Sequence, residues 1–145
     1  MSRRNPLPEE CLLLRVDDEE EQALDEAVHA LFKKARIHPT GRVVTVVLCI
    51  EVVVGAAMVS SEYDDSLDDW LYSFDVAVDD KWRRKTIART LVQDVLNKVN
   101  KGSASAAFRV EVVNPSMAKL LESFGFQAAS EDGWSPHDPY MTLNC

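Results

Sequence analysis

Five basic side chains gather in nine residues, in the segment KWRRKTIAR at 81–89. This segment follows an apolar run, WLYSFDVAV, and opens a stretch whose apolar residues have helical spacing. A helix N-terminus has unpaired N–H groups and about half a positive charge, so basic side chains there do not stabilise the helix. An anion would account for them, because the N–H groups, the helix dipole and the cations all attract it. A phosphorylated ligand fits this description best.

Two ionisable side chains stand in the apolar run that precedes the basic segment. Tyr72 and Asp75 are three positions apart, and side chains alternate along a strand, so the two lie on opposite faces. Each is a candidate catalytic proton carrier. Two structural alternatives stay open: Asp75 can pair with a neighbouring base, and Tyr72 can pack in the core.

The composition sets limits on the class of protein. A chain of 145 residues with 46% apolar and 28% charged residues has the size and make-up of one globular domain. Its net charge of −8 argues against nonspecific nucleic-acid binding, and no apolar run approaches the roughly 20 residues that cross a bilayer. We expect a flexible arm at 1–8, a single domain at 9–145, and neither a nucleic-acid nor a membrane partner.

The cysteines and the N-terminus bear on cellular location. Cys11, Cys49 and Cys145 are odd in number, widely spaced and match no metal-ligand pattern, so we expect no metal site. Two of them are interpreted as small apolar groups of the core, with Cys145 at the terminus. The first residues, MSRRNPLPEE, have no apolar stretch typical of a secretion signal, which predicts a cytoplasmic protein.

The patterns predict an order of strand, helix, three strands, helix, strand, helix and two strands. The first strand is expected at 11–16, a helix follows over about 17–37, and a β-branched run at 43–63 needs two strands with Glu51 marking their turn. After an acidic loop at 62–70 come a strand to Val78, a helix over about 81–100 and a strand at 108–113. A short helix ends at Gly125, and two weaker strands follow at 126–130 and 140–144. The fold class is α/β, of the α+β type: one mixed sheet of about six to seven strands with helices on both faces. If the strands before and after the crossover helix are neighbours, they must be parallel.

Two segments, VAVDDKWRRKTIARTL and NPSMAKLLESFGF, resemble the acyl-coenzyme A signature of the GNAT N-acetyltransferase superfamily. That signature follows a valine pair with Q/R-x-x-G-x-G/A, and here Arg83, Ile87 and Ala88 match while Thr86 replaces the glycine. The second segment matches at Asn114, Leu120, Gly125 and Phe126, but Leu121 stands where many relatives have a tyrosine. The resemblance extends from about Leu7 to Cys145.

The resemblance implies an acetyl-CoA cosubstrate and direct transfer of the acetyl group to a primary amine of a small molecule or peptide. The residues it implies for acetyl-CoA binding are Val76, Val78, Arg83, Arg84, Lys85, Thr86, Ile87, Ala88 and Asn114. The backbone groups of Val76 and Val78 would bind the pantetheine arm as if it were a strand. For the amine it points to the segment after the first strand and to the last hairpin. In that hairpin Trp134, His137 and Tyr140 stand beside Glu131, Asp132 and Asp138, and acids and aromatic rings suit a cationic amine.

The two departures from the signature leave other functions open. Leu121 cannot protonate a departing thiolate, although a thiol with a reference pKa of about 8.5 leaves without much help. A catalytically silent acyl-CoA sensor or protein-interaction module is therefore the main alternative, and a nucleotide-phosphate binder is a third. The sequence also leaves a homodimer open.

Overall fold

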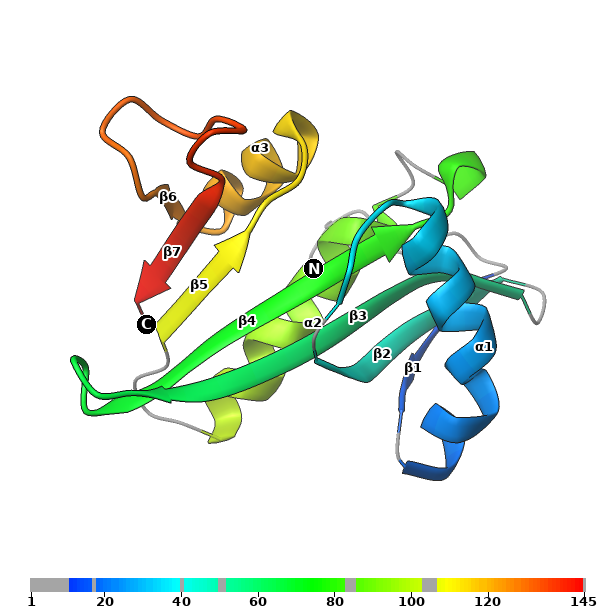
Figure 1. Ribbon diagram of the computed structural model, residues 1–145. Coiled ribbons are helices and arrows are strands. Elements are labelled where there is room, and N and C mark those ends of the chain that lie inside the picture. Colours follow the sequence, from blue (N-terminus) through cyan, green and yellow to red (C-terminus); the bar gives the residue numbers. More distant parts are fainter. Residues whose placement is uncertain are drawn as a thin grey trace, which may run out of the picture.

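Seven strands form one mixed sheet in the order β1-β2-β3-β4-β5-β7-β6 (Figure 1). The structure is a computed structural model that describes residues 11–16, 18–39, 41–49, 52–82, 86–102 and 107–144. The strands are β1 (Cys11–Arg15), β2 (Arg42–Cys49), β3 (Val52–Asp64), β4 (Asp69–Val78), β5 (Ala107–Glu111), β6 (Gln127–Ala128) and β7 (Tyr140–Asn144). The predicted fold class is confirmed. The predicted arm at 1–8, Glu51 and Cys145 lie outside the described residues.

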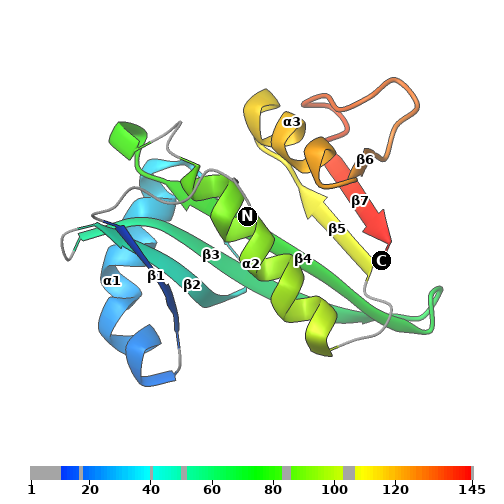
Figure 2. The same ribbon diagram turned by 180° about the vertical axis from the view of Figure 1, so that it is seen from behind.

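Helices cover both faces of the sheet, as predicted. Helix α1 (Asp18–Lys34) packs on one face, and α2 (Ile87–Gly102) and α3 (Pro115–Ser123) pack on the other (Figures 1 and 2). The hydrophobic core therefore consists of two clusters, one on each face of the sheet. Val28, Phe32 and Met58 belong to the cluster under α1. Leu91 and Leu121 belong to a larger cluster under α2 and α3. No helix in the described part of the chain has both the length and the apolar character that crossing a bilayer requires.

Strands β4 and β5 are parallel, as the crossover helix between them requires, but they pair only briefly. Their register has two pairs, Leu71↔Ala107 and Tyr72↔Phe108. Strand β4 then continues to Val78, fully paired with β3 on its other side. The sheet is therefore split along the last part of β4, which creates the space for a site.

Helix α2 begins six residues later than the sequence pattern predicts, at Ile87 rather than Lys81. A 3₁₀ turn, η1 (Asp80–Trp82), replaces the expected first helical turn, and it is closed by a bond from Trp82 N to Asp79 O at 2.8 Å. Thr86 has a φ of 66°, in the left-handed region. A right-handed helix cannot pass through that conformation, so α2 starts directly after it.

The predicted acidic loop at 62–70 is mostly strand. Strand β3 runs to Asp64 and β4 starts at Asp69, so the turn is confined to 65–68. The rings of Tyr63 and Trp70 meet edge to face at 5.8 Å across the hairpin and extend its pairing. The hydroxyl and N–H of Ser66 donate to Asp64, closing the turn and lowering the pKa of that carboxyl below its ordinary value.

Cys11 and Cys49 form a disulfide, so their interpretation as separate small apolar groups is wrong. They are register partners on the antiparallel strands β1 and β2, with Cα atoms 4.2 Å apart. The sequence separation of 38 residues carries no sign of this pairing, because only the strand register brings the two together. Both side chains also pack against the larger core cluster.

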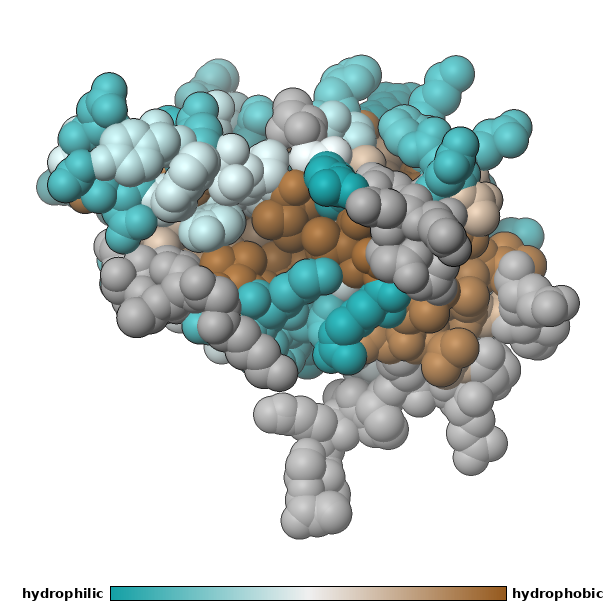
Figure 3. Space-filling model, turned by 90° about the horizontal axis from the view of Figure 1, so that it is seen from below, coloured by the Kyte–Doolittle hydropathy of each residue, from teal (hydrophilic) through white to brown (hydrophobic). Residues whose placement is uncertain are grey.

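Seen from below, the surface divides into a polar and an apolar region (Figure 3). Hydrophilic side chains lie over the β3–β4 hairpin and over α1, whereas apolar surface is exposed on the side where β1 lies. Leu12, on this edge strand, is 59% exposed. Arg15 on the same strand is held by Asp94 of α2, which accepts from Arg15 Nη2 at 2.7 Å and from Thr45 Oγ1 at 2.6 Å.

Candidate functional site

The last part of β4 has one edge that is not paired with another described strand, the edge that faces β5. Backbone N–H and C=O groups on this open edge point into the gap between β4 and β5. Asp79 N donates to Val54 O of β3 at 2.8 Å, so the backbone groups of residue 79 point toward β3. These groups alternate in direction along an antiparallel strand, and those of Val76 and Val78 therefore point away from β3. No described strand pairs with β4 beyond Tyr72. A free edge of this kind can accept an extended ligand as an additional strand.

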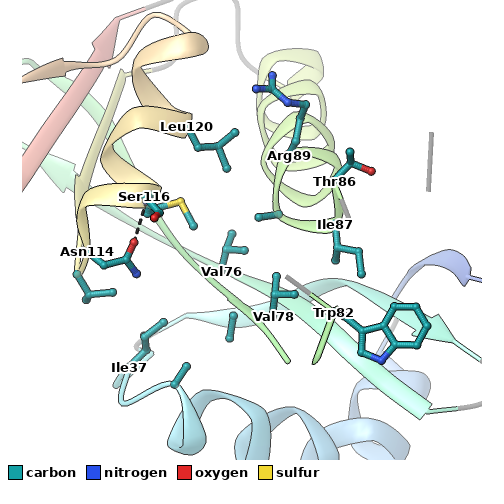
Figure 4. Close-up of a pocket in the computed structure, with 15 residues that line it drawn as sticks. Ile37, Val76, Val78, Trp82, Thr86, Ile87, Arg89, Asn114, Ser116 and Leu120 are labelled. Carbon is teal, nitrogen blue, oxygen red and sulfur yellow. Dashed lines mark hydrogen bonds between the residues drawn. The ribbon is translucent and has the colours of Figure 1, made fainter. Parts of the chain in front are cut away.

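A cavity of about 480 Å³ lies along this open edge. It is walled by the end of β4, the start of α2, the start of α3 and the segment after α1 (Figure 4). Its lining residues are Ala35, Ile37, Val76, Ala77, Val78, Trp82, Thr86, Ile87, Ala88, Arg89, Val113, Asn114, Ser116, Met117 and Leu120. Its size is in the range of small-molecule and cofactor sites, which are largely apolar with a few polar groups.

The first turn of α2 forms one wall of the cavity. Thr86 O accepts both the N–H and the hydroxyl of Thr90, each at 3.0 Å, which anchors the left-handed residue to the helix that follows it. Gly55 of β3 lets this turn approach the sheet, since a Cβ there would lie 2.7 Å from Ile87 Cγ2. Thr86, Ile87 and Ala88 are thereby held beside the end of β4.

The start of α3 forms the opposite wall. Asn114 caps this helix: its Oδ1 accepts from Met117 N at 2.8 Å, and Pro115 occupies the first helical turn, where no N–H is needed. Because the cap uses the side-chain oxygen, the amide nitrogen remains a donor. That nitrogen points toward the cavity (Figure 4). The side chains of Ser116 and Leu120 line the same wall.

Arg89 is the one charged side chain among the described residues that line the cavity. Its guanidinium lies 5.4 Å from the centre of the Phe124 ring, and its Nη2 is 3.4 Å from Ser123 Oγ. Both partners belong to the end of α3, so Arg89 spans the gap between α2 and α3. A cation in this place can bind an anionic part of a ligand that leaves the cavity between the two helices.

The structure brings six of the predicted acetyl-CoA-binding residues together. Val76, Val78, Thr86, Ile87, Ala88 and Asn114 all line the cavity. Arg83, Arg84 and Lys85 fall outside the described residues.

The two predicted proton carriers do not line this cavity. Tyr72 is partly buried and packs against the larger core cluster with its ring 5.9 Å from that of Phe108, in agreement with the core-packing alternative. Asp75 is half-buried on the opposite face of β4, where its register partner is Met58. Their placement on opposite faces agrees with the prediction.

The three predicted amine-binding residues are not among the residues that line the cavity either. Trp134 Nε1 donates to Val112 O at 3.3 Å, and the Tyr140 ring carries the Arg109 guanidinium 4.0 Å from its centre. His137 is exposed in the loop before β7.

The position of the expected tyrosine faces the core. Leu121 is fully buried in the larger cluster, and its neighbour Leu120 lines the cavity instead. Among the described lining residues, the side-chain hydroxyls are those of Thr86 and Ser116. A tyrosine at 121 would therefore have to reach the cavity through packed side chains.

Sequence reasoning missed much of the lining. Arg89 could have been found, since it belongs to the basic segment and follows the motif directly. Ile37 and Val113 carry no sequence signal, because they reach the cavity only through the way the segment after α1 and the end of β5 meet. Nowhere in the described ranges do three His, Cys, Asp or Glu side chains come together as a metal site would require.

Comparison with known proteins identifies the family and the fold. The sequence profile of the Acetyltransferase (GNAT) family matches residues 9–126. Curated protein sequences give no significant match. Three similar solved structures are a GCN5-related N-acetyltransferase from Kribbella flavida, Naa50 from Arabidopsis thaliana with the bisubstrate analogue CoA-Ac-MVNAL, and yncA from Salmonella typhimurium with acetyl-CoA.

These likenesses extend over almost the whole chain. The first has 19% identity, a TM-score of 0.65 and coverage of 95% of this chain and 99% of the other. Naa50 has 18% identity, a TM-score of 0.63 and coverage of 92% and 97%. The yncA structure has 16% identity, a TM-score of 0.62 and coverage of 92% of both chains. At such identities the likeness concerns the fold.

Proposed function

The chain belongs to the acetyltransferase (GNAT) family, and from this premise we propose that it is an acetyl-CoA-dependent N-acetyltransferase acting on a primary amine of a small molecule or peptide. Acetyl-CoA supplies the thioester: the amine nitrogen bonds to the acetyl carbon, the carbon–sulfur bond breaks, and CoA leaves as the thiol with a proton that the amine gives up. The cytoplasmic location and the homodimer stay predictions.

The open edge of β4 is the observation that carries this proposal. The backbone groups of Val76 and Val78 point into a cavity where no described strand pairs with them. The pantetheine arm of CoA is an extended chain with amide donors and acceptors, so it can pair with this edge as a strand would. The residues present therefore fit the cosubstrate.

Polar groups at the starts of α2 and α3 also support acetyl-CoA binding in this cavity. Asn114 keeps an amide donor toward the cavity, and Arg89 provides a cation where the gap between α2 and α3 opens. The start of α2 adds the positive end of its dipole. Arg83, Arg84 and Lys85 stay predicted phosphate-binding residues, on the sequence alone.

The main catalytic contribution required of this chain is to position the amine against the thioester. Holding an amine against a thioester replaces an encounter between two free molecules, which is a large part of such catalysis. A thiolate leaves without much acid assistance, so the leucine at 121 should slow the reaction rather than abolish it.

A catalytically silent acyl-CoA binder remains a second candidate. The observation that favours it is that Leu121 is fully buried and that no tyrosine hydroxyl lines the described part of the cavity. It predicts acetyl-CoA binding without turnover of any amine.

Isothermal titration with acetyl-CoA tests the proposal, with Ala88→Asp and Ala129→Asp as a matched pair. Ala88 is in the first turn of α2, where an acid suits the helix, but its carboxylate would repel phosphate. We expect Ala88→Asp to weaken binding at least about tenfold. Ala129 is exposed and away from the cavity, so Ala129→Asp should bind as the native chain does. Absence of binding to the native chain would refute both candidates.

A further inference from the structure

The Cys11–Cys49 disulfide lies at the same end of the sheet as the cavity. Cys11 is opposite Cys49 in the register of β1 and β2, and Cys49 is opposite Val52 at the start of β3. Three residues further along β3, Gly55 is opposite Val78 at the end of β4. Figure 2 shows the start of β1, the end of β4 and the start of α2 at this end of the sheet. Strand β3 alone separates the disulfide-linked pair of strands from β4.

The first residues of β3 hold two parts of the cavity wall in place. Val54 O accepts from Asp79 N at 2.8 Å, which fixes the backbone directly after Val78. A Cβ at Gly55 would lie 2.7 Å from Ile87 Cγ2, so the first turn of α2 packs closely against the same part of β3. Because Val78 and Ile87 both line the cavity, a shift at the start of β3 would move two of its walls.

The disulfide and this wall also share one hydrophobic core. Cys49, Val54 and Ile87 are buried members of the larger cluster, and Cys11 and Val78 pack against it. Packed cores contain few voids and therefore transmit strain. A change at the sulfur atoms thus has a continuous path of strand pairs and packed side chains to the cavity.

The edge strand β1 depends on the disulfide more than an inner strand would. It has five residues and pairs with β2 along one side. Its last residue is held by the bond from Arg15 Nη2 to Asp94 of α2, and its first residue is held by the disulfide. Reduction removes this covalent link and leaves the start of β1 to strand pairing and packing.

Small reagents can reach the pair through Cys11. Cys11 is half-buried, whereas Cys49 is 3% exposed. In the reduced chain, the Cys11 thiolate can attack oxidised glutathione, forming a mixed disulfide and releasing one glutathione thiol. The Cys49 thiolate then attacks the Cys11 sulfur and releases the second glutathione. The two cysteines lose two electrons and two protons, and oxidised glutathione takes up both as its two thiols form.

We propose that the Cys11–Cys49 pair is a redox switch that controls the affinity of the cavity for acetyl-CoA, with the disulfide as the form that binds more tightly. The inference rests on the proposed acetyl-CoA binding and adds its regulation. Disulfides in cytosolic proteins are typically transient and act in catalysis or redox sensing, so the cytoplasmic prediction agrees with this role.

Isothermal titration of the oxidised and the reduced chain measures the effect, at a temperature where circular dichroism shows both forms folded. Every protein carries Cys145→Ser, so that the third cysteine takes no part. The ligand is S-acetonyl-CoA, a thioether that glutathione does not cleave. We expect the oxidised chain to bind it at least about fivefold more tightly, the lower end of typical coupling between two sites. The double variant Cys11→Ala with Cys49→Ala should bind like the reduced chain at every glutathione ratio.

The same coupling must appear in the reverse direction, because linkage between two equilibria is reciprocal. Alkylation followed by mass spectrometry gives the ratio of squared glutathione to oxidised glutathione at which half of the pairs are reduced. Saturating S-acetonyl-CoA should shift this ratio by the same factor as the affinity, and a fivefold shift corresponds to about 20 mV for a two-electron couple. A disulfide that stabilises β1 without contact to the site would leave the ratio unchanged.

The outcomes separate this inference from the proposed function. Equal affinities of the oxidised and reduced chains would overturn the switch and leave the acetyl-CoA site standing. Tighter binding by the reduced chain, or a pair that oxidised glutathione does not convert to the disulfide, would overturn it as well. Absence of binding to either form would refute the site itself, and the switch with it.

Discussion

Thr86 combines a β-branched side chain with a left-handed backbone at the wall of the cavity. Its φ of 66° costs an L-residue roughly 1–2 kcal/mol relative to right-handed conformations. Glycine has no such cost, and it is the residue of the family signature at this position. The chain therefore keeps the backbone path of a glycine while presenting a threonine side chain to the site.

Replacing Thr86 by glycine should make the protein more stable. The gain from relieving the backbone exceeds the added entropy of glycine in the unfolded chain, so we expect about 0.5–1 kcal/mol of stabilisation in urea denaturation. Thr90→Gly is the matched control: Thr90 lies within α2, and the same change there should lower stability. A loss of stability in Thr86→Gly would show that interactions of the threonine side chain outweigh the backbone cost.

Leu121→Tyr tests whether the missing tyrosine limits the rate. Leu121 is fully buried, so the larger ring should destabilise the fold by about 1–3 kcal/mol. If the hydroxyl reaches the cavity, kcat should rise with little change in acetyl-CoA affinity. Leu121→Phe separates the two effects, because it adds the same ring without the hydroxyl. Equal rates in the two variants would show that the hydroxyl takes no part.

Among the elements, strand β4 matters most for the proposed binding of acetyl-CoA, and removal of the Val78 N–H can test its role. The backbone groups of Val78 point into the cavity, so proline at this last residue of β4 removes a donor toward the ligand without removing a bond to β3. We expect Val78→Pro to bind acetyl-CoA about 2- to 10-fold more weakly than Val78→Ala, which keeps the N–H. Equal affinities at equal thermal stability would contradict strand-like binding.

The disulfide is the second feature at the scale of elements, because it ties the edge strand β1 to β2. The Cys11–Cys49 disulfide joins residues that are 38 positions apart in the sequence. Its reduction should lower the free energy of unfolding by about 2–4 kcal/mol. Urea titrations with and without dithiothreitol measure this loss, and the double variant Cys11→Ala with Cys49→Ala should not respond to the reductant. In a reducing cytosol the pair would be a dithiol, so the cytoplasmic prediction implies the less stable form.

At the scale of the whole molecule, the sequence predicted the order of strands and helices along the chain and the helices on both faces, because hydrophobic periodicity reports which face of each element is buried. It predicted a parallel crossover on condition that the two strands are neighbours, and the structure places them so. Six of the residues predicted to bind acetyl-CoA line the cavity. Five of them lie in one short segment, from the end of β4 to the start of α2, so the sequence alone places them close together. Ile37 and Val113 could not be predicted, since they depend on how distant segments meet. The disulfide could not be predicted either, because it depends on the register of β1 against β2. The late start of α2 depends on the left-handed backbone of Thr86, which the sequence pattern does not indicate.

The split in the sheet leaves β4 and β5 paired over a short distance, and this gives the last prediction. Between β4 and β5 the register has two pairs, both far from the cavity end of β4. A ligand in the cavity contacts both sides, from Val76 and Val78 to Asn114 on α3, and therefore links them. Acetyl-CoA at a hundred times its dissociation constant should stabilise the fold by about 2.7 kcal/mol and raise Tm by roughly 5–10 °C. Amide hydrogen exchange should slow most at the end of β4 and the start of α3, with β1 as the internal reference. Protection that is spread evenly, or that is confined to one side of the split, would show that the ligand does not bridge it.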